Sequence, residues 1–501
     1  MPQPDLQLLP PKPLDLFNHP DEIQLQKLSQ QGDQCAAQGE YSRGIECYTQ
    51  ILRLDSESIE AYCARGRSQI ALKHYIDAKV DYAKAINLNP FSAVAYCGLA
   101  KAYYGLREYP AALVAIDLAI SLDDQNLDFY GCRAMINHKL GNHERVLIDC
   151  RIVLERQPHD SSTRWLNSVS HFHLGNYKIA IFNFTQYLNV RSNDFYAYYY
   201  RGICYEQLAN LPQALADLSH AILILNSSNS NRTENQSVIY RKRGRIRQRL
   251  GDLTSAMVDF NRAIQIDPAT AVSYCHRADI YVSRGDYPQA LVECNQAIQL
   301  QPQLVSAYYQ RGVIHTEMGN LSAALADYHK LIELNPLDVN AYIQRAWIYF
   351  RHGEYPSAIQ DCDRILTIDP NSIPANYLLG VVKSLSASKQ EAIVCFTNVI
   401  NLQPNFICAL YHRGLIYFDL QDQARAMKDF RLAQSIQDLS ADCISSRDES
   451  GLYAEGLALY HTGHSQTARV ILHQAAVVAQ KLKNDTFHHQ IIFTLEALGM
   501  S

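Results

Sequence analysis

The sequence lacks the short motifs that mark most catalytic and metal-binding domains. Its 13 cysteines form no C-x-x-C pair, and neither a G-x-x-x-x-G-K-[ST] phosphate loop nor an H-E-x-x-H zinc motif is present. Neighbouring histidines such as His171 and His173 diverge on a helix, and no cysteine completes a zinc-binding spacing with them. We therefore expect no enzyme activity, no metal and no cofactor.

Strong net charge and long apolar runs are also missing. The formal net charge is only -5, which gives no general attraction to nucleic acid or anionic membranes. No apolar run approaches the roughly 20 residues that span a bilayer, so membrane insertion is not expected. Residues 1–24 lack the basic start and apolar core of a signal peptide, and the first twenty contain six prolines. This segment is predicted to be an extended arm, and the odd cysteine count favours reduced thiols in the cytoplasm.

What the sequence does contain is a repeat of small residues spaced 34 positions apart. A single core rarely grows past about 250 to 300 residues, so a chain of 501 residues is expected to form several domains or an elongated array. The small residues are Gly32, Gly66, Ala100, Ala134, Ser168, Gly202, Gly244, Ala278, Gly312, Ala346, Gly380, Gly414 and Gly456. Two spacings are 42 instead of 34, which places polar insertions at 229–236 and 441–448. The pattern defines thirteen repeats.

Each repeat has the plan of two helices joined by a turn. The segment from Ala307 to Pro336 shows an apolar-periodic helix, a Gly-Asn turn and a second helix that ends before proline. Small residues also recur on the second helix, as at Ala324, where they permit close helix packing. The sequence therefore predicts an all-α fold.

This pattern resembles the tetratricopeptide repeat family over about residues 25–482. The resemblance implies a right-handed superhelical solenoid of about thirteen 34-residue helix-turn-helix units, with a groove lined by the first helix of each unit. Repeats 1–6 would span 25–228, repeats 7–12 would span 237–440, and repeat 13 would span 449–482. Residues 483–501 include an amphipathic stretch and are predicted to form a capping helix over the last apolar face.

The repeats also separate scaffold charges from other charges. When each repeat is numbered so that its small residue is eighth, the seventh residue is arginine in eight repeats, and the twenty-third is then always acidic. The pairs are Arg65/Asp81, Arg133/Asp149, Arg201/Asp217, Arg243/Asp259, Arg277/Glu293, Arg311/Asp327, Arg345/Asp361 and Arg413/Asp429. Because both positions lie eight residues from the turn, we predict partly buried, bidentate ion pairs within each hairpin.

The stretch "YRKRGRIRQRLGD" is the densest basic segment of the chain. Arg241, Arg245 and Arg249 share one helix face, which by the resemblance lines the groove, and Lys242 borders it. Arg247 takes a place that is tyrosine in other repeats, where it is expected to disturb packing unless its stem extends outward. The arginine face is either a site for an acidic partner or is neutralised by Glu206 and Asp279 in neighbouring repeats.

Aromatic residues at groove positions are the second set of candidate partner-binding residues. They are Trp165, Tyr199, Tyr309, Trp347 and Phe350, and they either anchor a ligand or pack between repeats. The predicted function is a non-enzymatic scaffold or adaptor that binds a protein or peptide with apolar anchors and some acidic residues. The alternative is single-stranded nucleic-acid binding by the basic helix 241–249, which would require basic residues along the whole groove.

Overall fold

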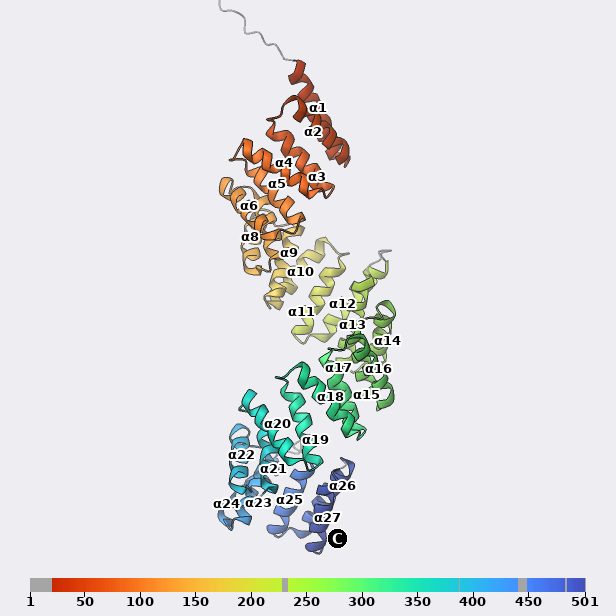
Figure 1. Ribbon diagram of the computed structural model, residues 1–501, viewed down its shortest axis with the longest axis vertical. Helices are drawn as coiled ribbons and strands as arrows, with labels where there is room; N and C mark the ends of the chain where they lie inside the picture. Colours follow the sequence, from red (N-terminus) through yellow and green to blue (C-terminus); the bar gives the residue numbers. More distant parts are fainter. Residues whose placement is uncertain (1–19, 228–232, 387, 440–447, 483, 501) are drawn as a thin grey trace, which may run out of the picture. The chain divides into compact units, whose positions relative to one another are not determined.

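The computed structural model of the chain describes residues 20–227, 233–386, 388–439, 448–482 and 484–500. These residues form 27 α-helices and contain no strand, which confirms the predicted all-α class (Figure 1). The helices belong to two bodies, an N-terminal body up to Arg232 and a C-terminal body from Thr233. Residues 1–19 of the predicted arm, 229–232 of the first predicted insertion and 441–447 of the second lie outside the described residues, whereas 233–236 of the first insertion belong to a helix that starts at Thr233.

The N-terminal body consists of six consecutive helical hairpins, which correspond to repeats 1–6. Its helices are α1 (Pro20–Ala37), α2 (Tyr41–Leu54), α3 (Ile59–Ala71), α4 (Tyr75–Leu88), α5 (Ala93–Gly105), α6 (Tyr109–Leu122), α7 (Leu127–Lys139), α8 (His143–Arg156), α9 (Ser161–His173), α10 (Tyr177–Val190), α11 (Phe195–Gln207) and α12 (Leu211–Ser227). The first helix begins at Pro20, five residues before the expected start of repeat 1.

The C-terminal body contains repeats 7–12 and a C-terminal segment of three helices. The repeat helices are α13 (Thr233–Arg249), α14 (Leu253–Ile266), α15 (Ala271–Ser283), α16 (Tyr287–Leu300), α17 (Val305–Glu317), α18 (Leu321–Leu334), α19 (Val339–Arg351), α20 (Tyr355–Ile368), α21 (Ile373–Leu385), α22 (Lys389–Leu402), α23 (Ile407–Asp419) and α24 (Gln423–Leu439). The C-terminal segment holds α25 (Glu449–His461), α26 (Ser465–Lys481) and α27 (Asp485–Ala497).

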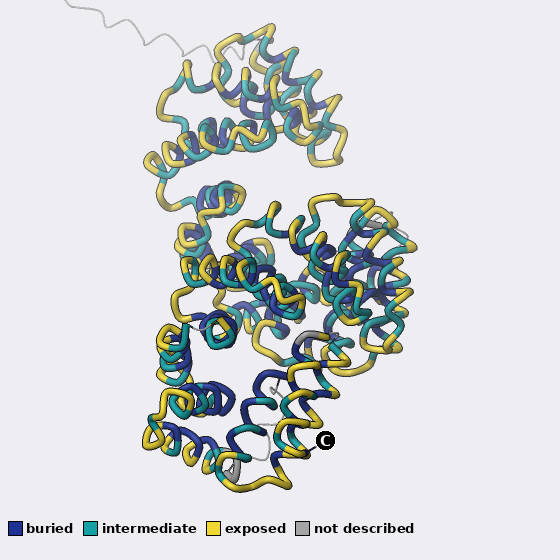
Figure 2. Tube along the Cα trace, turned by 60° about the horizontal axis from the view of Figure 1, so that its bottom comes forward, coloured by how far each residue is buried: buried dark blue, intermediate teal, exposed yellow. Residues whose placement is uncertain are grey.

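The period of 34 residues reflects how a side chain of the second helix fills each hairpin opposite the small eighth residue, and in repeats such as 2 and 9 this side chain is an aromatic ring. A Cβ atom added to Gly66 would lie 2.8 Å from the ring of Tyr82 on the facing helix, and one added to Gly312 would lie 2.9 Å from the ring of Tyr328. The eighth residue is small because the ring occupies the space where a longer side chain would stand. Figure 2 shows the result, with buried positions on the facing sides of the helices and exposed turns.

The turn inside each hairpin requires a left-handed backbone at the fifteenth position. Glycine supplies it in most repeats, for example Gly141 with a φ of 78° and Gly353 with a φ of 73°. Lys73, Arg107, Ala209 and Gln421 adopt the same conformation with φ between 57° and 64°. The geometry of the hairpin therefore overrides the local preference of these four residues.

All eight predicted arginine–carboxylate pairs are present, with closest N–O distances between 2.6 and 2.8 Å. Seven of them are bidentate, with Nε and Nη2 of the arginine donating to both carboxylate oxygens, as in the pair of Arg345 with Asp361. The exception is Arg277, which donates through Nη2 to Glu293 while its Nε has no hydrogen-bond partner among the described residues. Glutamate is one methylene longer than aspartate, so its carboxylate does not face the guanidinium in the same way.

Six of the eight arginines also connect their repeat to the one before it. Nη1 of Arg65 donates to Thr49 Oγ1 at 3.1 Å, and Nη1 of Arg311 donates to Asn295 Oδ1 at 2.6 Å. The same bond joins Arg133 to Asp117, Arg201 to Thr185, Arg277 to Asn261 and Arg413 to Thr397. Each acceptor is the twenty-fifth residue of the preceding repeat, a position that the sequence pattern had not singled out.

The C-terminal segment does not extend the stack of hairpins. α25 packs along α23, and its N-terminal end reaches α21, while α27 contacts α19 three repeats back. Within the described part of the C-terminal body, α24 and α25 do not pack as the other successive helices do. The segment therefore lies against the first helices of repeats 10–12, where a regular thirteenth repeat with a terminal cap would contact only its predecessor.

Candidate partner-binding surfaces

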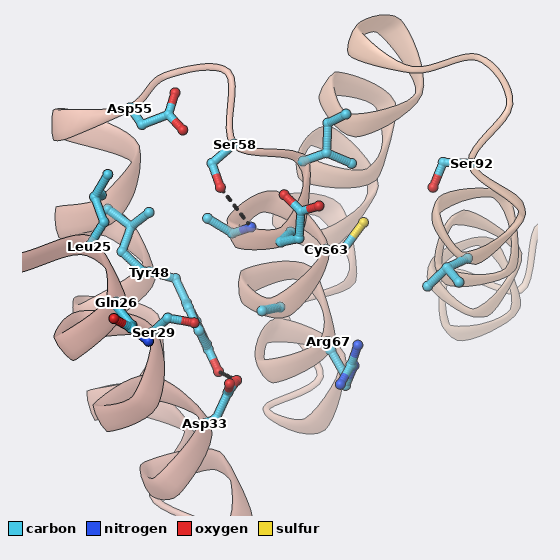
Figure 3. Close-up of a pocket in the computed structure, with 16 residues that line it drawn as sticks. Leu25, Gln26, Ser29, Asp33, Tyr48, Asp55, Ser58, Cys63, Arg67 and Ser92 are labelled. Carbon is cyan, nitrogen blue, oxygen red and sulfur yellow. Dashed lines mark hydrogen bonds between the residues drawn. The ribbon is translucent and has the colours of Figure 1, made fainter. Parts of the chain in front are cut away.

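A pocket of 710 Å³ lies between the first helices of repeats 1 and 2 (Figure 3). Its wall includes Ser29 and Asp33 on α1 and Cys63 and Arg67 on α3. Tyr48 donates from its hydroxyl to Asp33 Oδ1 at 2.8 Å, and its burial together with this bond raises the pKa of the phenol. The pocket combines apolar residues with three acidic side chains, Asp33, Asp55 and Glu60, and one basic side chain, Arg67. None of its residues was a sequence-based candidate.

The basic stretch of α13 is partly taken up by the scaffold. Asp259 binds Arg243 at 2.7 Å and also accepts from Nη1 of Arg247 at 2.8 Å. The expectation that Arg247 disturbs packing is thus replaced by a second ion pair, because its long stem reaches the carboxylate. Arg241 and Arg245 are half-buried and Arg249 is exposed.

Arg241, Lys242, Arg245 and Arg249 all have interaction partners. Asp279, considered as a neutralising partner, accepts a hydrogen bond from Gln310 Nε2 at 2.6 Å. The acidic side chain is therefore already bound to a neutral amide.

The aromatic candidates of the first two-thirds of the chain are half-buried. Trp165 stands between rings of the next helices, with its centroid 5.5 Å from that of Tyr187 and 5.9 Å from that of Tyr200. Tyr199 packs edge-on against Tyr200 at 5.5 Å, and Tyr309 packs edge-on against Tyr328 at 6.4 Å. These rings contribute to packing between helices and keep part of their surface accessible.

Aromatic residues on α19, α21 and α23 are covered instead. We call the sides of these three helices that contact the C-terminal segment the inner face. Tyr377 and Tyr411, at the fifth position of repeats 11 and 12, are 4% and 1% exposed, whereas Tyr309 at the same position of repeat 9 is half-buried. Phe350 is 2% exposed and lies 6.4 Å from Phe487 of α27. Trp347 packs beside Phe350 at 5.7 Å.

The start of α25 makes the polar contacts with the inner face. Oδ1 of Asp448 accepts bonds from the Tyr377 hydroxyl at 3.1 Å, from Ser450 Oγ at 3.0 Å and from the Gly451 backbone N–H at 2.6 Å. Glu449 is fully buried, and its Oε1 lies 3.5 Å from Nε of Arg351. These residues hold the N-terminal end of α25 against α19 and α21.

Burial changes the proton affinity of the groups at this contact. It raises the pKa of Asp448 to about 6, with the neighbouring charge of Glu449 acting in the same direction. Burial also lowers the pKa of His412, on α23, to about 4. The contact therefore holds a carboxyl group that takes up a proton more readily than an ordinary aspartate and an imidazole that resists protonation.

A group of three histidines lies in the N-terminal body. The rings of His143 and His173 stack at 4.5 Å, and His138 lies 5.7 Å from His143. Burial, with His143 as the next cause, lowers the pKa of His138 to about 4. Within the described ranges, no set of three histidine, cysteine or acidic residues has the arrangement of a metal site.

None of the helices of the described residues combines the length and apolarity needed to cross a lipid bilayer. All twelve of their cysteines are free thiols, and ten are buried.

The comparisons with known proteins agree with the hairpin pattern. A family model described as a TPR repeat matches residues 278–319, and models described as tetratricopeptide repeat match residues 59–92, 239–270, 309–373 and 409–438. The match at 59–92 coincides with repeat 2, from the start of α3 to the residue before α5. The chain is thus built from helical hairpin repeats of one recognised type. It is a tetratricopeptide repeat protein.

Several solved structures are similar to parts of the chain. A tetratricopeptide repeat protein from Parabacteroides merdae is 20% identical, covers 52% of this chain and 99% of its own, and superposes with a TM-score of 0.41. YrrB, described as a TPR protein with an unusual peptide-binding site, is 19% identical over 39% of this chain and 97% of its own, with a TM-score of 0.33. Yeast Tom70 is 16% identical over 95% of this chain and 97% of its own, with a TM-score of 0.32. No curated protein matches the chain.

Proposed function

We propose that the protein is a non-enzymatic scaffold that binds a helical or extended segment of a partner protein on the first helices of its repeats. The observation that carries the proposal is the burial of α25 against α19, α21 and α23. A surface of this kind that accommodates a helix of its own chain has the shape and the anchors to bind a helix of another protein. The free thiols support a reducing compartment such as the cytoplasm.

The charges of α13 give the partner a second property. Arg241, Lys242, Arg245 and Arg249 concentrate positive charge on one helix, so we propose that the partner carries acidic residues next to its apolar anchors. The half-buried rings of Trp165, Tyr199, Tyr309 and Trp347 are the proposed apolar contacts.

Charge reversal tests this function. A tagged chain with Arg241, Arg245 and Arg249 changed to glutamate is compared with wild type in affinity capture. We expect the captured proteins that carry acidic segments to be lost, because reversal turns attraction into repulsion. Circular dichroism checks that the variant is folded.

A matched control places the same charge change on second helices. Arg262, Arg364 and Arg431 are exposed on α14, α20 and α24, and their change to glutamate should leave capture unaltered. Capture of the same partners by both triple variants would show that the basic face of α13 has no part in binding.

A further inference from the structure

The C-terminal segment occupies the surface that a partner would use. α25 runs along α23, with Gly451 against Cys408 near the start of both helices and His461 stacked on Phe418 at 4.1 Å near their ends. Its first residues reach Tyr377 on α21 and Arg351 on α19. Three successive repeats therefore contribute to one continuous contact with a single helix.

The fit selects small residues on the side of α25 that faces α23. A Cβ atom at Gly451 would lie 2.6 Å from the Cys408 sulfur, which is closer than side-chain atoms approach. Ala454 and Ala458 follow at i+3 and i+7, both at most 1% exposed, and they pack with Leu410 and Tyr411. A helix that binds this face must therefore carry a stripe of glycine and alanine, since larger residues would lift it off α23.

The fit also selects acidic residues at the start of the helix. Asp448 receives the Tyr377 hydroxyl, and Glu449 stands opposite the guanidinium of Arg351. At the start of the helix, Asp448 acts as a hydrogen-bond acceptor, and Glu449 is the residue whose charge faces a cation. The inner face thus distinguishes the orientation of the helix as well as its composition.

The polar part of this contact is less complete than the ion pairs of the scaffold. Oε2 of Glu449, Nε of Arg351 and Nε2 of His412 are buried without a hydrogen-bond partner among the described residues. Each such group costs about 1–3 kcal/mol relative to a satisfied one. In contrast, seven of the eight scaffold arginines bind their carboxylates through two nitrogens. Buried polar atoms without hydrogen bonds limit the strength of the contact that holds the segment. A contact of limited strength allows another helix to displace the segment.

We propose that the segment from Asp448 onward is a built-in ligand of the inner face, and that a partner helix with an acidic start and a glycine–alanine stripe binds there by displacing it. The proposal rests on the proposed scaffold function and specifies both the partner and its regulation. A tethered ligand has an effective concentration of about 1 mM, so a segment that itself binds the open face with a dissociation constant of about 100 µM weakens the binding of any competing partner about tenfold.

A single substitution, Gly451→Cys, provides both an open and a closed form of the full chain. The added Cβ would lie 3.2 Å from the Cβ of Cys408, near the roughly 3.8 Å spacing of a disulfide, so a small shift allows the two thiols to be joined. Oxidation with diamide should lock the segment in place. Reduction should loosen it, because the new side chain crowds Cys408.

The probe is a fluorescein-labelled synthetic segment of residues 448–498, and its binding is measured by fluorescence anisotropy. We expect the reduced variant to bind the probe at least tenfold more tightly than wild type, and the oxidised variant not to bind it. The matched control, Gly451→Cys with Cys408→Ser, should bind the probe equally with and without oxidant.

Equal affinity of the oxidised and reduced forms, or no binding by the reduced form, would overturn the proposal. Dimerisation of the reduced variant in light scattering would also overturn it, because a second copy would then be the occupant. If the proposed scaffold function is wrong, the result is different. The probe would then bind the reduced variant and not the oxidised one, but neither the wild type nor either form of the variant would capture a partner.

Discussion

The ion pair of repeat 10 offers a quantitative test of how the scaffold charges act. Replacing Asp361 by alanine leaves Arg345 without its carboxylate partner, while the side chains are 13% exposed for Arg345 and 4% for Asp361. Breaking a buried pair in this way costs about 3–5 kcal/mol. Because the guanidinium of Arg345 retains some contact with water, we expect a loss near the lower limit of about 3 kcal/mol.

Repeat 3 supplies the natural replacement for the pair. It has Leu99 and Ala115 at the two corresponding positions, and both belong to its apolar core. The double variant Arg345→Leu with Asp361→Ala should therefore lie within about 1 kcal/mol of wild type, since well-packed apolar residues often replace a buried pair at little cost. The coupling energy of the double-mutant cycle should exceed about 2 kcal/mol, because the double variant loses less than Asp361→Ala alone and Arg345→Leu carries a cost of its own.

The assay uses one of the two tryptophans of the chain as a local reporter. Trp347 stands on α19 two residues after Arg345, and Trp165→Phe removes the other signal. Urea unfolding followed by the fluorescence of Trp347 then reports on repeat 10 in all variants of this background. A double variant that loses the sum of the two single losses would refute the reasoning, because it would show no energetic link between the two side chains.

Three further predictions follow from individual contacts. Glu293→Asp should stabilise its repeat by about 0.5–1.5 kcal/mol in urea, because Arg277 gains a second bond, and an unchanged midpoint would contradict this. His138 has a folded pKa of about 4, below its ordinary 6.5, so stability is complete above pH 6.5 and falls as the pH drops towards 4. Unfolding followed by Trp165 should show a loss of about 1 kcal/mol at pH 5 after allowance for solvent screening, and His138→Leu should remove the difference. The raised pKa of Asp448 penalises docking of α25 as the free carboxyl group ionises, and the penalty grows between its ordinary pKa of 3.8 and about pH 6. A full chain with Asp448→Asn lacks this penalty and holds its own segment more tightly, so it should bind the probe more weakly than the wild-type chain, by a factor about tenfold larger at pH 7.5 than at pH 5.

The repeats and their ion pairs were predictable because the sequence contains its own controls. Eight repeats with arginine at the seventh position all have an acidic twenty-third residue, and repeats without the arginine do not. Because the seventh and twenty-third positions face each other in a helical hairpin, this correlation within one chain predicts a contact between them. The sequence pattern did not predict the bonds that six of the arginines make to the preceding repeat, although Thr49, Asp117 and Asn295 already show a polar residue at the twenty-fifth position.

The placement of the C-terminal segment was not predictable from periodicity. Gly456 keeps the repeat pattern, so the sequence favours a regular thirteenth hairpin whichever surface it packs on. Two features of the sequence are consistent with packing on the inner face but do not predict it. Glu455 replaces the arginine of the seventh position, and the stripe of Gly451, Ala454 and Ala458 lies on one side of the helix. Only tertiary contacts distinguish stacking at the end from packing on the inner face.

The covered inner face makes folding of the C-terminal body depend on completed synthesis. Translation delivers α19, α21 and α23 before α25, because α23 ends at Asp419 and α25 begins at Glu449. A nascent or prematurely terminated chain that lacks this segment presents Phe350, Tyr377 and Tyr411 together to the solvent. Exposed aromatic surface of this kind is what chaperones and proteases recognise in unfinished proteins. A chain that ends before α25 therefore lacks the cover of this aromatic surface.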